Sequence, residues 1–221
     1  MTISPASMIS ISIHRSLFTI VFALLLAAGS AGAEEAKPAA ADFFPLRVDY
    51  SWTYRNTSDD SQFTLKVLKE TKQEDGSIRY LVEMMAGVQI HRYFSKPEGW
   101  VLLHFEQYPE HPGLEAKYEP PKKYLQNPLV PGFKWQWNGK DYTQQEFAED
   151  STVAEFEEVT VPAGKFRAMK LVSHVTGAAN PMIRTYWYAD GVGLIKTTTE
   201  AKTMQYGSEL VDYSFKKDAK K

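Results

Sequence analysis

The residues of this chain that come closest to a reactive set are His104, Glu106 and His111. Imidazole nitrogens and carboxylate oxygens bind zinc, and a catalytic zinc site needs three such ligands around an open position. If this segment is a strand, alternation places His104 and Glu106 on one face, and His111 follows in a proline-containing loop. A metal site also needs matching geometry and supporting hydrogen-bond partners. We therefore interpret the three as polar residues of a half-buried strand and predict no metal site.

Other catalytic patterns offer no better candidate. His91 and His174 have no nucleophile beside them, and the acidic residues Glu155, Glu157 and Glu158 precede a predicted turn. Paired carboxylates can act as acid and base, but an acidic run is common on the solvent face of a strand. The sequence has no G-x-S-x-G elbow, no glycine-rich phosphate loop and no H-E-x-x-H motif. We predict that the protein is not an enzyme and uses no cofactor.

Composition excludes further classes. The sequence contains no cysteine, which excludes a thioether-linked lipid anchor, disulfide bonds, a zinc-thiolate site and a cysteine nucleophile. Without the predicted export signal, 24 basic residues face 27 acidic ones, a net charge of −3 that does not suggest a nucleic-acid partner. Stability must then come from the core, and a domain of about 150 residues buries roughly 70% of its unfolded surface.

The first 33 residues have the pattern of an export signal. Arg15 precedes an apolar run from Leu17 to Ala28, which is shorter than the ~18 residues of a membrane-spanning helix. Small residues then suit cleavage between Ala33 and Glu34, and Met8 could serve as the start instead of the first residue. We predict a periplasmic or secreted protein without a stable membrane anchor, with an uncleaved anchor as the alternative.

The rest of the chain alternates with a period of two residues. Tyr50, Trp52 and Tyr54 alternate with polar residues, and similar segments flank turns at 74–77 and 96–99. The dipeptide at 138–139, Asn-Gly, is typical of a type I′ hairpin turn. The best helical candidate is short, at 121–126. Eleven or twelve short strands predict an all-β protein with an antiparallel sheet, curved or closed into a half-barrel to protect its edges.

We predict a disordered leader at 34–42, one β domain at 43–215 and a basic tail at 216–221. Six prolines lie in the segment 109–131. Because proline cannot donate to a β-ladder, this segment is expected to connect two halves or to cover one mouth of the barrel.

The two halves share a pattern. A Pro-Leu pair is followed at the same spacing by a tryptophan and then by a second aromatic residue, which predicts pseudo-repeats at 43–108 and 126–215. Convergent hairpin chemistry is the alternative. The residues are Pro45, Leu46, Trp52 and Tyr54 in the first half and Pro128, Leu129, Trp135 and Trp137 in the second.

Aromatic residues are the main excess, with 29 in the whole chain. Each ring buries about 150–250 Å² in a core, but a concave sheet could also line a ligand cavity with rings. The sequence leaves both a packed and a hollow barrel open. The candidate lining residues are Trp52, Tyr54, Trp135, Trp137, Trp187 and Tyr188.

Two segments carry a resemblance to a known group. Residues 161–166 read VPAGKF and residues 187–196 read WYADGVGLIK. With the Pro-Leu pattern, they resemble a broad group of uncharacterised bacterial envelope proteins, whose sheets are similar to the open half-barrels of the lipoprotein carriers LolA and LolB. The motifs mark turns, so they imply no binding residue, and the helices that plug the carriers' barrels are not evident here. The resemblance implies lipid or acyl-chain binding, although fold alone does not fix function.

We therefore expect an exported, non-catalytic β-protein that binds a lipid, an acyl chain or another apolar molecule on an aromatic concave face. The alternative is an accessory or structural protein that contacts another envelope protein.

Overall fold

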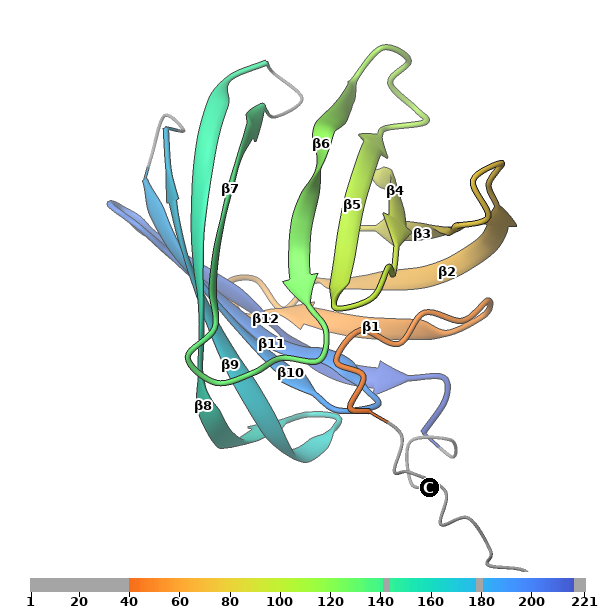
Figure 1. The fold of residues 1–221 in the computed structure, drawn as a ribbon. Helices are drawn as coiled ribbons and strands as arrows, with labels where there is room; N and C mark the ends of the chain where they lie inside the picture. Colours follow the sequence, from red (N-terminus) through yellow and green to blue (C-terminus); the bar gives the residue numbers. More distant parts are fainter. Residues whose placement is uncertain (1–39, 141–143, 178–180, 217–221) are drawn as a thin grey trace, which may run out of the picture. The chain divides into compact units, whose positions relative to one another are not determined.

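The computed structural model describes residues 40–140, 144–177 and 181–216, which form one twelve-stranded antiparallel sheet (Figure 1). Strands that follow each other in sequence are paired, except for β6 and β7, and β1 pairs with β12. The strands are β1 (Ser51–Asn56), β2 (Gln62–Lys72), β3 (Ile78–Met85), β4 (Gln89–Ser95), β5 (Trp100–Gln107), β6 (Glu115–Gln126), β7 (Lys134–Lys140), β8 (Glu146–Val161), β9 (Gly164–Thr176), β10 (Met182–Ala189), β11 (Gly193–Ala201) and β12 (Met204–Tyr213).

This architecture confirms the predicted all-β antiparallel class and the expected number of strands. The sheet curls until β6 and β7, its two end strands, approach each other, so the barrel is nearly closed (Figure 1). Within the described ranges, no helix is long and apolar enough to cross a membrane. The predicted signal, with its cleavage position at Ala33 and Glu34, lies outside the described residues, as does the tail beyond Lys216.

Most predicted turns are confirmed, and two local predictions are wrong. The chain turns between β2 and β3 and between β4 and β5, as expected. Asn138 and Gly139, predicted to form a hairpin turn, lie instead inside strand β7. The glycine is needed there because the Trp137 ring occupies the space of a side chain. A Cβ on Gly139 would lie 1.9 Å from the Trp137 ring. The segment 121–126, predicted to be helical, is the end of strand β6.

The proline-rich segment 109–131 is not simply a connection, because β6 occupies half of it. Proline is tolerated there since β6 is an end strand, paired on only one side with β5. The register shows how the ladder accommodates Pro120 and Pro121: Lys117 pairs with Phe105, while Lys122 already pairs with Leu103. The two prolines therefore lie in a bulge.

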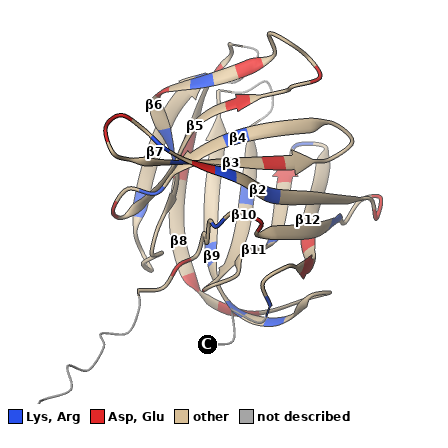
Figure 2. Cartoon of the chain, turned by 90° about the vertical axis from the view of Figure 1, so that its right-hand side faces the viewer, with Lys and Arg blue, Asp and Glu red and all other residues tan. Residues whose placement is uncertain are grey.

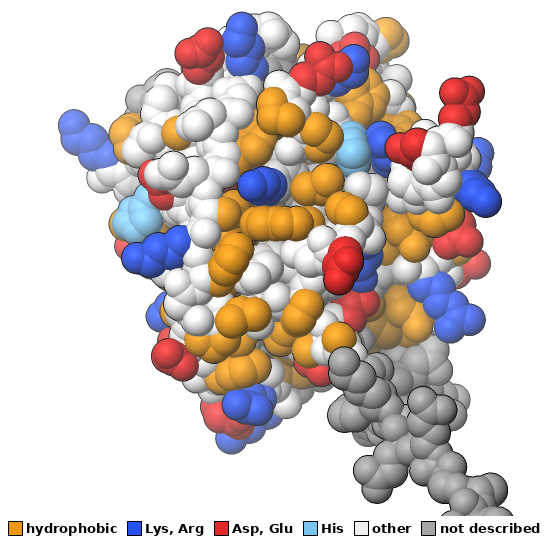
Figure 3. All heavy atoms as spheres, viewed as in Figure 1, with side chains coloured by type: hydrophobic (Ala, Val, Ile, Leu, Met, Phe, Trp, Pro, Cys, Tyr) orange, Lys and Arg blue, Asp and Glu red, His pale blue; other side chains and the backbone are white. Residues whose placement is uncertain are grey.

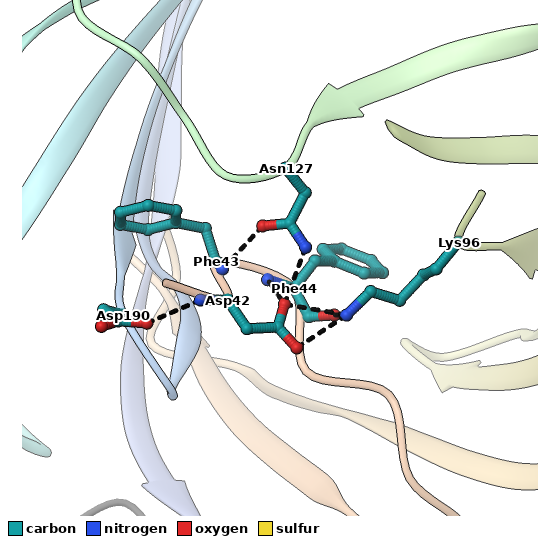
Figure 4. A network of polar contacts seen from close by, with 6 residues as sticks. All are labelled: Asp42, Phe43, Phe44, Lys96, Asn127 and Asp190. Carbon is teal, nitrogen blue, oxygen red and sulfur yellow. Dashed lines mark hydrogen bonds and ion pairs between the residues drawn. The ribbon is translucent and has the colours of Figure 1, made fainter. Parts of the chain in front are cut away.

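One end of the barrel is closed by the chain before β1 and by the connection from β6 to β7. The Asp42 carboxylate accepts hydrogen bonds from Lys96 Nζ at 2.7 and 2.8 Å and from Asn127 Nδ2 at 2.9 Å. The Asn127 side chain also accepts a bond from the Phe43 backbone N–H at 2.9 Å (Figure 4). Asp42, predicted as the last residue of a disordered leader, is therefore held in a polar network.

The same network ties two hairpin turns to this end. The Asp42 backbone N–H donates to the Asp190 carboxylate at 2.7 Å (Figure 4). The Gly191 N–H donates to the Asp42 carbonyl at 2.9 Å. In the first half, the Asn127 N–H donates to the Gly99 carbonyl at 3.1 Å. The turns before β5 and β11 are thus fixed in similar ways.

The two halves of the sheet also match at their first strands. The second and fourth residues of both β1 and β7 are buried aromatics. Trp52 Nε1 donates to the Val192 carbonyl at 2.7 Å, and Trp135 Nε1 donates to the Lys123 carbonyl at 3.0 Å. These matching positions are compatible with two pseudo-repeats, whereas an origin by duplication stays a prediction.

Candidate functional site

The barrel contains a cavity of about 520 Å³ that is partly open to solvent and is lined by residues from every strand except β7. Pockets that hold small molecules commonly measure ~300–1,000 Å³. Met84, Tyr108, Met182 and Tyr206 line it near the turns opposite the closed end, whereas Tyr188 lies toward that end. The alternation of the strands produces the cavity, because every second side chain points inward.

A half-buried ion pair crosses one side of the cavity. Arg92 Nε donates to Glu106 Oε1 at 2.6 Å, and the Tyr118 hydroxyl donates to Glu106 Oε2 at 2.5 Å. Burial alone would raise the pKa of Glu106, but Arg92, the Tyr118 hydroxyl and Lys122 outweigh it and hold that pKa below its usual value. Burial and Glu106 raise the pKa of Tyr118 well above its usual value. Glu106 is therefore an anion and Tyr118 a neutral donor at neutral pH.

A second charged group lies across the cavity. Lys122 Nζ contacts Glu149 Oε2 at 2.5 Å, and both side chains are about nine-tenths buried. Arg184 on β10 is hydrogen-bonded to Tyr186, two residues further along the same face. Burial alone would lower the pKa of Arg184, but Tyr186 and Glu149 outweigh it and raise that pKa. The guanidinium is therefore charged.

The two sides of the cavity differ in chemistry. Apart from the Arg92–Glu106 ion pair, the wall formed by β1 to β5 is mainly apolar and contains Phe63, Leu65, Met84 and Leu103. The wall formed by β9 to β12 is rich in hydroxyl groups, and four of them are Ser173, Thr197, Thr199 and Ser208. Such a cavity can hold a molecule with one apolar and one polar part.

Two of the six predicted lining residues contact this cavity. Tyr54 and Tyr188 line it, and the Tyr54 hydroxyl donates to the Leu194 carbonyl at 2.9 Å. Burial raises the pKa of both tyrosines well above the usual value, so both are neutral. Trp52 lies nearer the closed end, where with Tyr54 it lines a separate apolar cavity of about 40 Å³.

The remaining three tryptophans lie elsewhere. Trp135 and Trp137 are buried where β6 approaches β7: the Trp135 ring lies 5.6 Å from that of Trp100, and the Trp137 ring 5.4 Å from that of Tyr118. Hydrophobic side chains gather on this face of the molecule (Figure 3). Trp187 points to the outer face, where Nε1 donates to Glu157 at 2.9 Å. Alternation explains this, because the neighbouring Tyr188 points inward.

The structure does not bring together His104, Glu106 and His111, the three residues that we rejected as a metal set. His104 and Glu106 do not share a face, because His104 is the extra residue of a bulge: Phe94 pairs with Leu103 and Tyr93 with Phe105. Leu103 and Glu106 both line the cavity, whereas His104 does not. Among the described residues, no group of three or more acidic or histidine side chains could hold a metal ion.

His104 instead forms a serine–histidine pair. Its Nε2 lies 2.8 Å from the Ser95 hydroxyl. Burial, together with the positive charge of Arg79, lowers the pKa of His104 to about 4, so the imidazole is neutral at neutral pH. A neutral imidazole can activate a serine, but Ser95 is only 5% exposed and lines neither the 520 Å³ cavity nor the 40 Å³ cavity. This pair offers a substrate no access.

Two solved structures are similar to this chain at low sequence identity. One is a predicted lipoprotein from Parabacteroides distasonis, 14% identical, with a TM-score of 0.48; it covers 80% of this chain and 100% of its own. The other is a predicted exported protein with a YmcC-like fold from Bacteroides fragilis, 15% identical, with a TM-score of 0.49; it covers 79% of this chain and 100% of its own. No protein-family profile and no curated protein matches. Similarity to LolA and LolB stays a prediction.

Proposed function

We propose that this chain is an exported, non-catalytic envelope protein that binds a molecule with an apolar chain inside its barrel. The 520 Å³ cavity is the observation that carries this proposal. The export pattern of the first 33 residues supports a periplasmic location.

The interior favours binding over simple packing. A packed barrel would fill its centre with side chains at the density of an organic crystal. Here the apolar side chains of β1 to β5 face polar side chains of β9 to β12 across open space. Each Å² of apolar cavity surface that a ligand removes from water contributes about 25 cal/mol to the free energy of binding. An apolar chain is therefore a favourable occupant.

The alternative, contact with another envelope protein through an open sheet edge, has weaker support. β6 and β7 are the unpaired edges, and an exposed edge can pair with a partner strand. Pro120 and Pro121 interrupt β6, and Lys117 and Glu119 add charge beside them. Prolines and charges are the features by which natural sheets prevent edge pairing. We therefore place the binding site inside the barrel.

A neutral fluorescent probe, N-phenyl-1-naphthylamine, tests this proposal. We expect the wild-type protein to bind the probe and Leu171→Trp to weaken binding by about tenfold or more, because a larger side chain fills the cavity. Val172→Trp is the matched control, since Val172 is the next residue of β9 and does not line the cavity. Thermal melting verifies that both variants fold.

Two results would count against the proposal. One is absence of probe binding to the wild-type protein, and the other is equal weakening by the variants at 171 and 172. If Leu171→Trp does not fold, displacement of the probe from the wild-type protein by unlabelled dodecan-1-ol decides the matter. A probe that no alkyl chain displaces is bound outside a chain-binding site.

A further inference from the structure

The charges inside the cavity do not balance. Five charged side chains line it, three cations and two carboxylates: Arg92, Lys122, Arg184, Glu106 and Glu149. Arg92 pairs with Glu106, and Lys122 pairs with Glu149. Across the described part of the chain, Arg184 forms no ion pair, and its hydrogen bond is to the Tyr186 hydroxyl. The cavity therefore has one excess positive charge, at Arg184.

Polar side chains surround Arg184 on the inner wall. In antiparallel sheets, residues directly opposite each other across a ladder lie on the same face. Arg184 pairs with Ser173 on β9 and with Thr199 on β11, and Thr199 pairs with Tyr206 on β12. All four residues line the cavity. The row Ser173–Arg184–Thr199–Tyr206 thus places one guanidinium among three hydroxyl groups.

This row suits an oxyanion. A guanidinium binds carboxylate or phosphate through two parallel N–H···O bonds, and hydroxyl groups can donate further bonds to the same oxygens. A buried charge is costly unless an opposite charge and hydrogen bonds compensate it. Since Arg92 and Lys122 already have their carboxylates, Arg184 is the cation that a bound anion would compensate.

Opposite this row lies the apolar wall. Phe63 and Leu65 of β2, Met84 of β3 and Leu103 of β5 contribute to it. One molecule that contacts both walls must carry an anionic group and an apolar part.

We infer that the ligand is an amphipathic anion, an alkyl chain with one carboxylate or phosphate head group, whose head is held by the Ser173–Arg184–Thr199–Tyr206 row. This inference rests on the proposed function, because it needs the cavity to be a binding site. It adds the charge of the ligand and the residues that recognise it.

A series of ligands with the same chain tests the inference. Displacement of N-phenyl-1-naphthylamine is measured for dodecanoate, dodecyl phosphate, dodecan-1-ol and dodecylamine. We expect one or both anions to bind about tenfold or more tighter than the alcohol, and the amine to bind weakest. The order of the two anions identifies the head group as carboxylate or phosphate.

Variants then assign the effect to a residue. Arg184→Met removes the charge at similar volume, and we expect it to abolish the preference for anions while leaving the affinity for dodecan-1-ol within about twofold. Arg184→Lys should retain much of the preference. Arg167→Met is the control, because Arg167 is an exposed arginine whose guanidinium lies 4.0 Å from the Phe156 ring.

The outcomes separate the two claims. If the alcohol binds as tightly as the anions, or if Arg184→Met retains the preference, the inference is wrong while chain binding stands. If none of the four compounds displaces the probe, the proposed function itself fails. The comparison of ligands on the wild-type protein decides the question even if a variant does not fold.

Discussion

The inner and outer faces of strands β8 to β12 differ in whether their positively charged side chains form ion pairs. On the outer face, Lys170 lies 3.0 Å from Glu157, and Lys196 lies 3.1 Å from Glu209. Arg55 of the neighbouring β1 lies 3.4 Å from the same Glu209. On the inner face, Arg184 forms no ion pair among the described residues, although Tyr186 and the charge of Glu149 raise its pKa.

An unpaired cation has different consequences on the outer surface and inside the cavity. Viewed from a second side, acidic and basic residues are scattered over the strands and turns (Figure 2). An unpaired cation on such a surface is solvated by water and costs little, whereas an unpaired cation in a cavity loses part of its hydration. An exposed arginine such as Arg167, which forms no ion pair among the described residues, therefore costs little, whereas Arg184 lines the cavity without an ion-pair partner. That contrast is the physical reason to connect Arg184 with a ligand.

The largest difference between the faces is expected from two adjacent aromatic residues. Tyr188 is 1% exposed and lines the cavity, whereas Trp187 lies on the outer face against Glu157, Lys170 and Lys196. We expect Tyr188→Ala to lower the free energy of unfolding by about 3–5 kcal/mol and Trp187→Ala by about 1 kcal/mol. Denaturant titration measures both. Equal losses would contradict the assignment of the two faces.

A smaller difference is expected between two ion pairs. Glu149→Ala leaves Lys122 without a partner in a buried position and should cost about 3 kcal/mol of stability. Glu157→Ala breaks a pair whose side chains are 42% and 32% exposed, and should cost about 1 kcal/mol or less. Urea unfolding of both variants measures the difference, and a larger loss for Glu157→Ala would overturn the comparison.

The smallest effect concerns pH. The pKa of His104 is about 4 in the folded protein because burial and Arg79 disfavour its charged form, against about 6.5 in an unfolded chain. The unfolded state therefore binds more protons, and stability is lost as the pH falls from about 6.5 to 4. Because His104 is only half-buried, we expect this loss to be about 1–2 kcal/mol or less.

His104→Gln should reduce that loss while keeping a hydrogen-bonding group near Ser95. Thermal melting between pH 7 and 4 provides the measurement. A pH dependence that is unchanged in the variant would show that His104 does not titrate as its surroundings indicate.

Much of the fold could be predicted from the sequence, because alternation reports which face of a strand is buried. It gave the number of strands and the inward direction of Tyr54, whereas the prediction that the neighbours Trp187 and Tyr188 both line the cavity ignored alternation. Alternation failed where the register of the ladder shifts, because the bulge at His104 places His104 and Glu106 on different faces. It also gave no sign that β6 is an edge strand or that the Trp137 ring lies over Gly139.

The candidate site was only partly predictable. Arg184 lies at every-second-residue spacing from Met182, Tyr186 and Tyr188 and therefore on the same face of β10, so its inward direction could have been predicted from the sequence. A charged residue in phase with buried aromatics was the missed signal. That it has no ion-pair partner among the described residues depends on β4, β5, β6 and β8 meeting around one cavity, and no local pattern contains that information.

The central claim, an anionic alkyl-chain ligand in the barrel, is tested most directly by native mass spectrometry of the protein purified from its own cell envelope. Denaturing extraction then identifies the released molecule in negative-ion mode. We predict one bound molecule per chain, with an acidic head group and a single alkyl chain, and a much lower occupancy in Arg184→Met. A ligand-free mass for the wild-type protein, or a neutral or cationic ligand, would contradict the account.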